Sequence, residues 1–166
     1  MHPKVADPAA LLAELARADI DCIVIGGTAA ALHGSMLGTL GVDVVRKVAP
    51  AATQKLLPLL ADLDAWFRFD LANRQLRPDH THLDGKGALL FSTRLGPLDM
   101  LGQLNDGRDY QQLLPHTIEM TIGVARVRVL DLPTLIEVKR AAGRPKDLLA
   151  VGHLAALLRE RRGDAG

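Results

Sequence analysis

Residues 23–30, Ile-Val-Ile-Gly-Gly-Thr-Ala-Ala, decide the fold. The β-branched residues before the glycines predict a short buried strand over 21–25. The two glycines predict a tight turn, and the alanine-rich run over 28–32 predicts a helix with Thr28 as its cap. A glycine turn lets the backbone pass close to a ligand, and the start of the following helix offers N–H groups to a phosphate. A turn that uses glycine only for packing has the same pattern, so both interpretations stay open.

Helical and strand patterns alternate on both sides of this stretch. Apolar spacing predicts helices over 7–17, 50–63, 109–114, 132–142 and 145–162, and strands over 42–46, 66–69, 88–93 and 97–101. Residues 117–122 and 125–130 predict a hairpin around Gly123. The alternation predicts a mixed α/β (α+β) fold. We expect one domain over 1–166, with a core over about 7–130 and C-terminal helices over about 131–162.

Composition excludes several classes of protein. With 48% hydrophobic and 23% charged residues among 166, the chain has globular composition. Aromatic residues make up only 3%, which argues against a stacking platform for single-stranded nucleic acid. The single Cys22 excludes a disulfide framework and a cysteine-based zinc site. No apolar run is long enough to span a membrane and no signal-peptide pattern begins the chain, so a cytoplasmic protein is expected.

Charge is distributed unevenly along a chain whose net charge is +1. Residues 126–166 carry nine basic and five acidic side chains. This excess predicts either a solvated helix face or a surface that faces phosphates. Arg126 and Arg128 alternate on one predicted strand and could form a basic wall.

Two aspartates stand inside apolar strand patterns. Asp43 lies among valines, and Asp99 lies between Leu98 and Met100. A buried carboxylate is costly unless it is paired or bound to a metal. Each aspartate is therefore predicted to belong either to a site or to a structural ion pair.

The histidines give weaker signals. His33 closes the alanine-rich helix and is predicted to make a cap or turn contact. His80 and His82 are spaced like strand neighbours on one face, and with Asp84 they could approach a transition metal. No further ligand is evident in the sequence, so metal binding is not expected there.

The order of these motifs resembles the nucleotidyltransferase superfamily, with its polymerase-beta-like minimal fold, and in particular small bacterial proteins of toxin–antitoxin type. A strand, Gly26–Gly27 and a helix come first, and the strand around Asp43 matches the Asp-x-Asp strand. Gly-Pro-Leu-Asp-Met-Leu, residues 96–101, matches the segment of the third carboxylate. A downstream basic segment is matched by Lys139, Arg144, Lys146 and Asp147.

The resemblance implies a mixed-sheet nucleotidyltransferase core and a site for a Mg²⁺-bound nucleoside triphosphate. Asp43 and Asp99 would be the catalytic carboxylates and the Mg²⁺ ligands. The implied nucleotide-binding residues are Gly26, Gly27, Thr28, Lys139, Arg144 and Lys146. The implied reaction transfers a nucleotide to a hydroxyl of a protein, an RNA end or a small molecule. Asp147 would sit in the first turn of the last helix, where a carboxylate also stabilises the helix dipole.

The sequence departs from the family pattern at Gly41, where the first Asp of Asp-x-Asp is expected. With one carboxylate fewer, we expect weak Mg²⁺ binding and slow or absent transfer. Gly41→Asp is predicted to strengthen metal binding, because alternate strand residues share a face. Two alternatives remain: an inactive binding module that is half of a toxin–antitoxin-like two-component system, and an unrelated α/β protein with a glycine turn.

Overall fold

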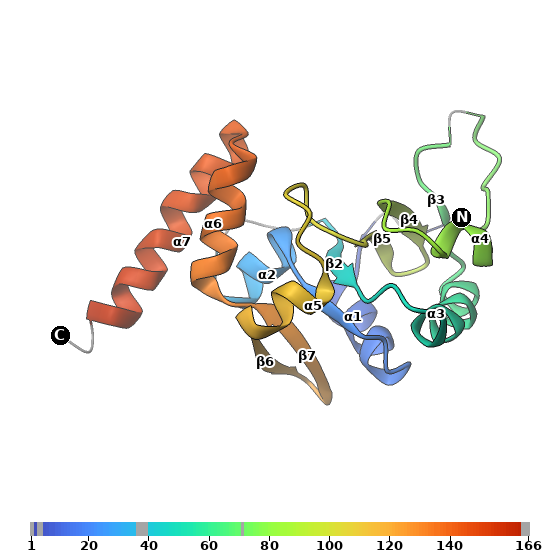
Figure 1. Cartoon of the computed structure of the whole chain (residues 1–166), viewed down its shortest axis with the longest axis horizontal. Coiled ribbons are helices and arrows are strands. Elements are labelled where there is room, and N and C mark those ends of the chain that lie inside the picture. Colours follow the sequence, from blue (N-terminus) through green and yellow to red (C-terminus); the bar gives the residue numbers. More distant parts are fainter. Residues whose placement is uncertain (1, 3–4, 36–39, 71, 164–166) are drawn as a thin grey trace.

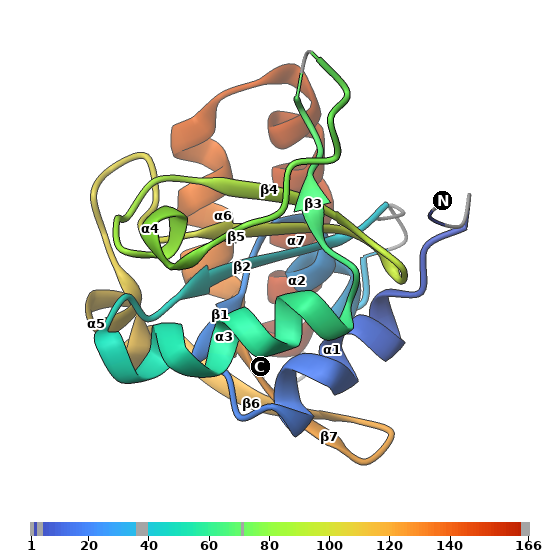
Figure 2. The same cartoon turned by 90° about the vertical axis from the view of Figure 1, so that its right-hand side faces the viewer.

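The computed structural model describes residues 2, 5–35, 40–70 and 72–163. Within these ranges the strands form one seven-stranded sheet of order β3-β4-β5-β2-β1-β7-β6 (Figures 1 and 2). The strands are β1 Cys22–Val24, β2 Val42–Arg46, β3 Trp66–Phe67, β4 Leu89–Thr93, β5 Gly96–Leu101, β6 Thr117–Ile122 and β7 Ala125–Leu130.

The sheet is mixed, as the sequence predicts. β2 pairs with β5, and β1 with β7, in parallel, whereas the other neighbouring strands are antiparallel. β6 and β7 form the predicted hairpin around Gly123, which has a φ of 60°. The fold class is therefore confirmed as a mixed sheet flanked by helices.

Helices cover both faces of the sheet. Figure 2 shows α1 and α3 in front of the sheet, with α6 and α7 behind it. The bounds of the helices are α1 Pro8–Arg17, α2 Gly26–Leu32, α3 Pro50–Asp62, α4 His80–Leu83, α5 Tyr110–Leu113, α6 Leu132–Ala142 and α7 Pro145–Gly163, with a 3-10 turn over Leu114–His116.

The first helix illustrates how the sequence builds these layers. The Asp7 carboxylate accepts a hydrogen bond from the N–H of Ala10 and caps α1, and Pro8 occupies the first turn. Leu11, Leu12 and Leu15 are at most 2% exposed. Each buried leucine stabilises the fold by about 1.5–3 kcal/mol. Elsewhere the core is also mainly aliphatic, which agrees with the low aromatic content.

Three local predictions are wrong. α2 begins at Gly26, so Thr28 lies in its first turn and is not its cap. β3 contains only two residues, because only Trp66 and Phe67 pair with β4. His80 and His82 lie in the short helix α4 rather than on a strand, because Asp79 accepts backbone hydrogen bonds there and closes a helical turn.

Two further sequence expectations concern the ends of elements. Gly143 ends α6 with a φ of 70°, the left-handed conformation that favours glycine at this position. His33 follows α2 and is buried, and its ring Nε2 lies 2.8 Å from the carbonyl oxygen of Leu130. His33 is thus the residue that caps the C-terminus of α2, as the sequence predicts, whereas the contact of its ring with β7 was not predicted. Over the described ranges, no helix has the length and apolarity that a membrane span requires.

Candidate active site

Asp43 and Asp99 are direct neighbours on the parallel strands β2 and β5. Paired residues in register carry their side chains on the same face of a sheet. Both aspartates line a cavity of about 1070 Å³ whose other walls come from α2, α6 and α7. The structure therefore brings into one cleft the two aspartates that the resemblance assigns to one site.

The two carboxylates perturb each other. The pKa of Asp43 is raised to about 6, first by burial and then by the charge of Asp99 and a hydrogen bond between the two carboxyl groups. The positive charges of Lys139 and Arg68 oppose this rise. Like charges held together in a partly buried site are stabilised by a proton or by a cation between them.

The donor set fits Mg²⁺, which prefers oxygen ligands and keeps several waters. Two carboxylates would leave the remaining positions to water and phosphate oxygens. Among the described residues no group of three or more His, Cys, Asp or Glu is arranged to hold a metal ion. The site therefore offers a divalent ion two aspartates and not a full carboxylate cage.

Gly26 lies directly against Asp43. Its φ is +62°, and a Cβ atom there would lie 2.7 Å from Oδ2 of Asp43. Both the backbone conformation and the space therefore require glycine. Gly26 and Gly27 line the same cavity as the carboxylates, so the glycine turn and the aspartates belong to one site.

Thr28 has a different place from the one that the resemblance implies. Its side chain is buried, and its hydroxyl donates a 2.7 Å hydrogen bond to the carbonyl oxygen of Gly41. The cavity lining includes Gly26 and Gly27 but not Thr28. Thr28 thus ties α2 to the chain that enters β2.

Gly41 lies opposite Pro97, one residue before β2 begins. A Cβ atom at Gly41 would lie 2.5 Å from the carbonyl oxygen of Pro97 and 2.8 Å from its Cβ. A side chain at this position would require β2 and β5 to move apart, so Gly41→Asp has a steric cost that the sequence does not indicate, and its predicted gain in Mg²⁺ binding stays a prediction. Where the family pattern has a carboxylate, this chain packs Gly41 directly against Pro97.

The predicted basic residues line the cavity from α6 and the start of α7. Lys139 comes from α6, and Arg144 and Lys146 flank the turn between the two helices. Burial lowers the pKa of Lys139, and the charges of Asp147 and Asp43 oppose this change. Gly143 reverses the chain here, which allows both helices to contribute cations to one wall.

Asp147 organises this wall. Its side chain is 5% exposed and accepts a 2.5 Å hydrogen bond from Nε of Arg144. Burial alone would raise the pKa of Asp147, but the hydrogen bond and the charge of Arg144, together with Lys139 and Lys146, lower it on balance. Asp147 lies in the first turn of α7, as the sequence predicts.

Sequence reasoning missed Arg68. Its Nη2 donates a 2.6 Å hydrogen bond to Oδ1 of Asp99, and its Nη1 donates to the carbonyl oxygen of Phe91 at 2.6 Å. Arg68 also lines the cavity. The available signal was a single charge inside the aromatic run Trp-Phe-Arg-Phe, residues 66–69.

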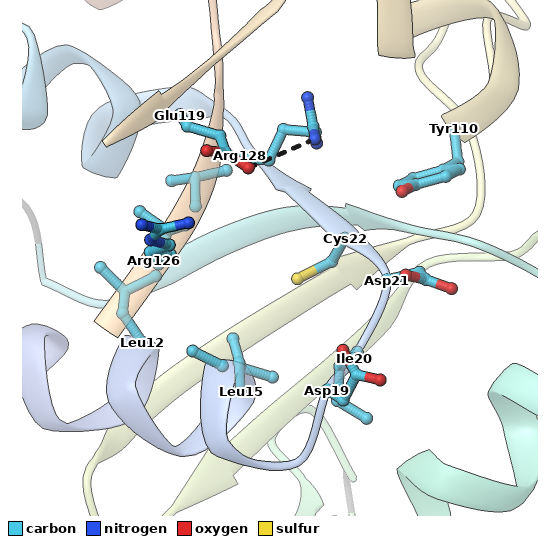
Figure 3. Close-up of a pocket in the computed structure, with 13 residues that line it drawn as sticks. Leu12, Leu15, Asp19, Ile20, Asp21, Cys22, Tyr110, Glu119, Arg126 and Arg128 are labelled. Atoms are coloured by element: carbon cyan, nitrogen blue, oxygen red, sulfur yellow. Dashed lines mark ion pairs between the residues drawn. The ribbon is translucent and has the colours of Figure 1, made fainter. Parts of the chain in front are cut away.

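A second cavity, of about 180 Å³, lies between the end of α1, the start of β1 and the hairpin (Figure 3). Arg126 and Arg128 line this cavity and not the one that holds the aspartates. Nη2 of Arg128 lies 3.7 Å from Oε1 of Glu119 (Figure 3, dashed line). Burial raises the pKa of the Cys22 thiol in this cavity to about 12, so the thiol stays protonated at neutral pH.

Comparisons with known proteins agree with this geometry at the level of fold. No protein-family profile matches the sequence, and no curated protein matches it significantly. The structure is similar to the lincomycin-bound lincosamide antibiotic adenylyltransferase LnuA, with a TM-score of 0.61 at 12% identity over 89% of this chain and 94% of that one.

Two further solved structures are similar. A putative nucleotidyltransferase from Thermotoga maritima gives a TM-score of 0.54 at 14% identity, covering 93% of this chain and 89% of that one. An antigenic nucleotidyltransferase-like protein from Paracoccidioides brasiliensis gives 0.54 at 16% identity, covering 90% and 72%. The chain has the nucleotidyltransferase fold.

Proposed function

We propose that the chain binds a Mg²⁺-bound nucleoside triphosphate in the cavity of Asp43 and Asp99 and transfers its nucleotide to a hydroxyl acceptor. The observation that carries the proposal is the in-register pair of carboxylates beside Gly26, whose positive φ and close approach to Asp43 favour glycine. A wall of three cations faces the same cavity. Carboxylates for a metal and cations for phosphates are the complementary halves of a nucleotide site.

Each half has a distinct role in the proposed reaction. Asp43 and Asp99 hold the ion, which when bound supplies positive charge to the phosphate oxygens. Lys139, Arg144 and Lys146 neutralise the triphosphate, and the bare backbone of the glycine turn leaves room for it. The acceptor oxygen bonds to the α-phosphorus, the bond from the α-phosphorus to the bridging oxygen breaks, pyrophosphate leaves and the hydroxyl proton passes to solvent.

The lining of the cavity favours a small molecule as the acceptor. Its volume of about 1070 Å³ exceeds that of most single-ligand pockets, which are roughly 300–1,000 Å³. Leu101, Leu104, Leu135 and Val138 supply an apolar part of the wall beyond the charged groups. LnuA, which shares the fold, is an adenylyltransferase of an antibiotic. The transfer test must distinguish a small-molecule acceptor from the two other acceptors, an RNA end and a protein hydroxyl.

The first test of this function measures nucleotide binding. Calorimetric titration with ATP, CTP, GTP and UTP, with and without Mg²⁺, should show Mg²⁺-dependent binding to the natural chain. Asp43→Asn and Asp99→Asn should weaken it on the order of a hundredfold, because an ionised ligand contributes about 3 kcal/mol. Asp62→Asn is the matched control, since Asp62 is exposed and lies outside the cavity lining.

The same titration tests the basic wall. Lys139→Ala should weaken nucleotide binding about tenfold, whereas Arg140→Ala, an exposed neighbour on α6, should leave it unchanged. If Lys139→Ala and Arg140→Ala both bind nucleotide as tightly as the natural chain, the basic segment is only a solvated helix face.

Transfer is measured separately, with labelled nucleotide and hydroxyl-bearing small molecules, RNA and proteins as acceptors. A second candidate function is an inactive binding module that is half of a two-component system. The packing of Gly41 against Pro97, which leaves no room for a further carboxylate, favours it over transfer. The absence of transfer to any acceptor, together with the absence of Mg²⁺-dependent nucleotide binding, would select this candidate, whereas binding without transfer would leave only the nucleotide-binding part of the first proposal.

A further inference from the structure

Arg68 is bonded directly to one of the two proposed metal ligands. Its guanidinium bridges the carboxylate of Asp99 on β5 and the carbonyl of Phe91 on β4, each at 2.6 Å. Its side chain is 25% exposed, and it lines the cavity. Two anchors on neighbouring strands fix the guanidinium in place while leaving it open to the cavity.

The hydrogen-bonding capacity of both partners allows Arg68 and a cation to share Asp99. A guanidinium carries five N–H donors, and the two bonds to Asp99 and Phe91 use two of them. A carboxylate offers about four lone-pair positions. Arg68 can therefore keep its bond to Asp99 and present further donors to a phosphate, which planar guanidinium groups bind in pairs of hydrogen bonds.

Arg68 also enters the cavity from a different part of the fold than the other cations. It follows β3 at one edge of the sheet, whereas Lys139 and Arg144 come from α6 and its end, which Figure 1 shows at the other side of the molecule. A polyphosphate between these groups would have positive charge on two sides. The site thus has a fixed cation next to the carboxylates, where Gly41 leaves it one anionic ligand short.

We propose that Arg68 contacts the phosphates of the bound nucleotide and acts as a fixed positive charge beside a single Mg²⁺, in a site that lacks the carboxylate for a second ion. This inference rests on the proposed function. The inference adds one point to that function: Arg68, held in place by Asp99, contributes to phosphate binding even when Mg²⁺ is absent, whereas Asp43 contributes only through the ion.

Calorimetry with ATP and with inorganic tripolyphosphate, each with and without Mg²⁺, tests the proposal. Arg68→Ala should weaken binding of both ligands about tenfold or more, in both conditions, because one charge-assisted contact is lost. The affinity of Arg68→Lys should lie between those of the natural chain and Arg68→Ala, since lysine keeps the charge but not the planar pair of donors. Arg77→Ala is the control, because Arg77 pairs with Asp64 and lies outside the cavity lining.

The outcomes separate the inference from the function on which it rests. If the natural chain binds ATP and Arg68→Ala binds both ligands equally well, the inference is wrong and the proposed function stands. If Arg68→Ala binds Mg²⁺ more tightly and tripolyphosphate unchanged, Arg68 competes with the ion, which also overturns the inference. If the natural chain binds no nucleotide, both fail. Thermal unfolding of each variant shows whether it folds. If Arg68→Ala does not fold, Arg68→Lys is compared with the natural chain instead.

Discussion

The two cavities hold similar residue types in opposite arrangements. In the smaller one Arg128 lies beside Glu119, so opposite charges neutralise each other near the surface. In the larger one two carboxylates face each other in register, and burial and their mutual charge raise the pKa of Asp43 to about 6. Arg68 pairs with Asp99 there, but burial and the charge of Asp99 still disfavour the ionised form of Asp43, which destabilises the fold when no ligand is bound. The unfavourable geometry, rather than the presence of charge, marks the larger cavity as the place where a ligand belongs.

The largest expected effect comes from filling the larger cavity at Gly26. Gly26→Ala should destabilise the chain by about 3 kcal/mol, since it combines a strained positive φ with a Cβ 2.7 Å from Oδ2 of Asp43. Gly123→Ala should cost only about 1 kcal/mol, because Gly123 has a φ of +60° but open space. Urea unfolding compares the two. Equal losses would show that backbone strain alone explains Gly26.

Gly41 tests whether the larger cavity can be completed. Gly41→Asp should destabilise the chain by about 2 kcal/mol, because its Cβ would meet the backbone oxygen of Pro97 at 2.5 Å. Its new carboxylate should tighten Mg²⁺ binding only if β2 and β5 move apart. Isothermal titration with Mg²⁺ and urea unfolding measure the two effects. Tighter Mg²⁺ binding in a stable variant would show that β2 and β5 separate easily here.

The raised pKa of Asp43 predicts a dependence of stability on pH. Between about pH 4 and pH 6 the folded chain holds a proton on this group that the unfolded chain has released, so stability falls as pH rises through this window. The loss should be on the order of 2 kcal/mol by pH 7. Asp43→Asn should remove this loss and unfold at higher urea than the natural chain at pH 7. Identical pH profiles of the two chains would contradict the raised pKa of Asp43.

The smallest effect is expected in the smaller cavity. Arg128→Ala should change the free energy of unfolding by less than about 1 kcal/mol, because its ion pair with Glu119 is partly exposed. Nucleotide affinity should be unaffected. A large loss of affinity would mean that this cavity, and not the carboxylate cavity, binds the ligand.

What the sequence predicted depended on local pattern. The strand assignments of Asp43 and Asp99 followed from two short segments in which a single carboxylate stands among apolar residues, whereas their pairing register came from the structure. The four-residue helix α4 was missed because a side-chain cap at Asp79, and not a hydrophobic period, sets it. Arg68 was missed because its partners lie on β4 and β5, and nothing near residue 68 in the sequence indicates that contact.

The orientation of single side chains was the least predictable feature. Thr28 matches the family pattern in the sequence, but in the fold its hydroxyl donates to Gly41 instead of lining the cavity. The crowding between Gly41 and Pro97 likewise depends on how closely two segments approach, which residue spacing does not report. The order of the motifs therefore predicted which strands and helices form the site. The structure was needed to show which of their atoms are in contact.

The parallel pairing of β2 with β5 has a consequence for folding. The segments that carry Asp43 and Asp99 are far apart in the sequence, with α3, β3, α4 and β4 between them. Contacts over such a long loop are costly in chain entropy and form slowly. The carboxylates therefore meet only once the centre of the sheet has closed, and a cation that needs both of them would bind the native chain and not its unfolded ensemble. Mg²⁺ with nucleotide should then slow unfolding, which gives the site a kinetic signature that is independent of any acceptor.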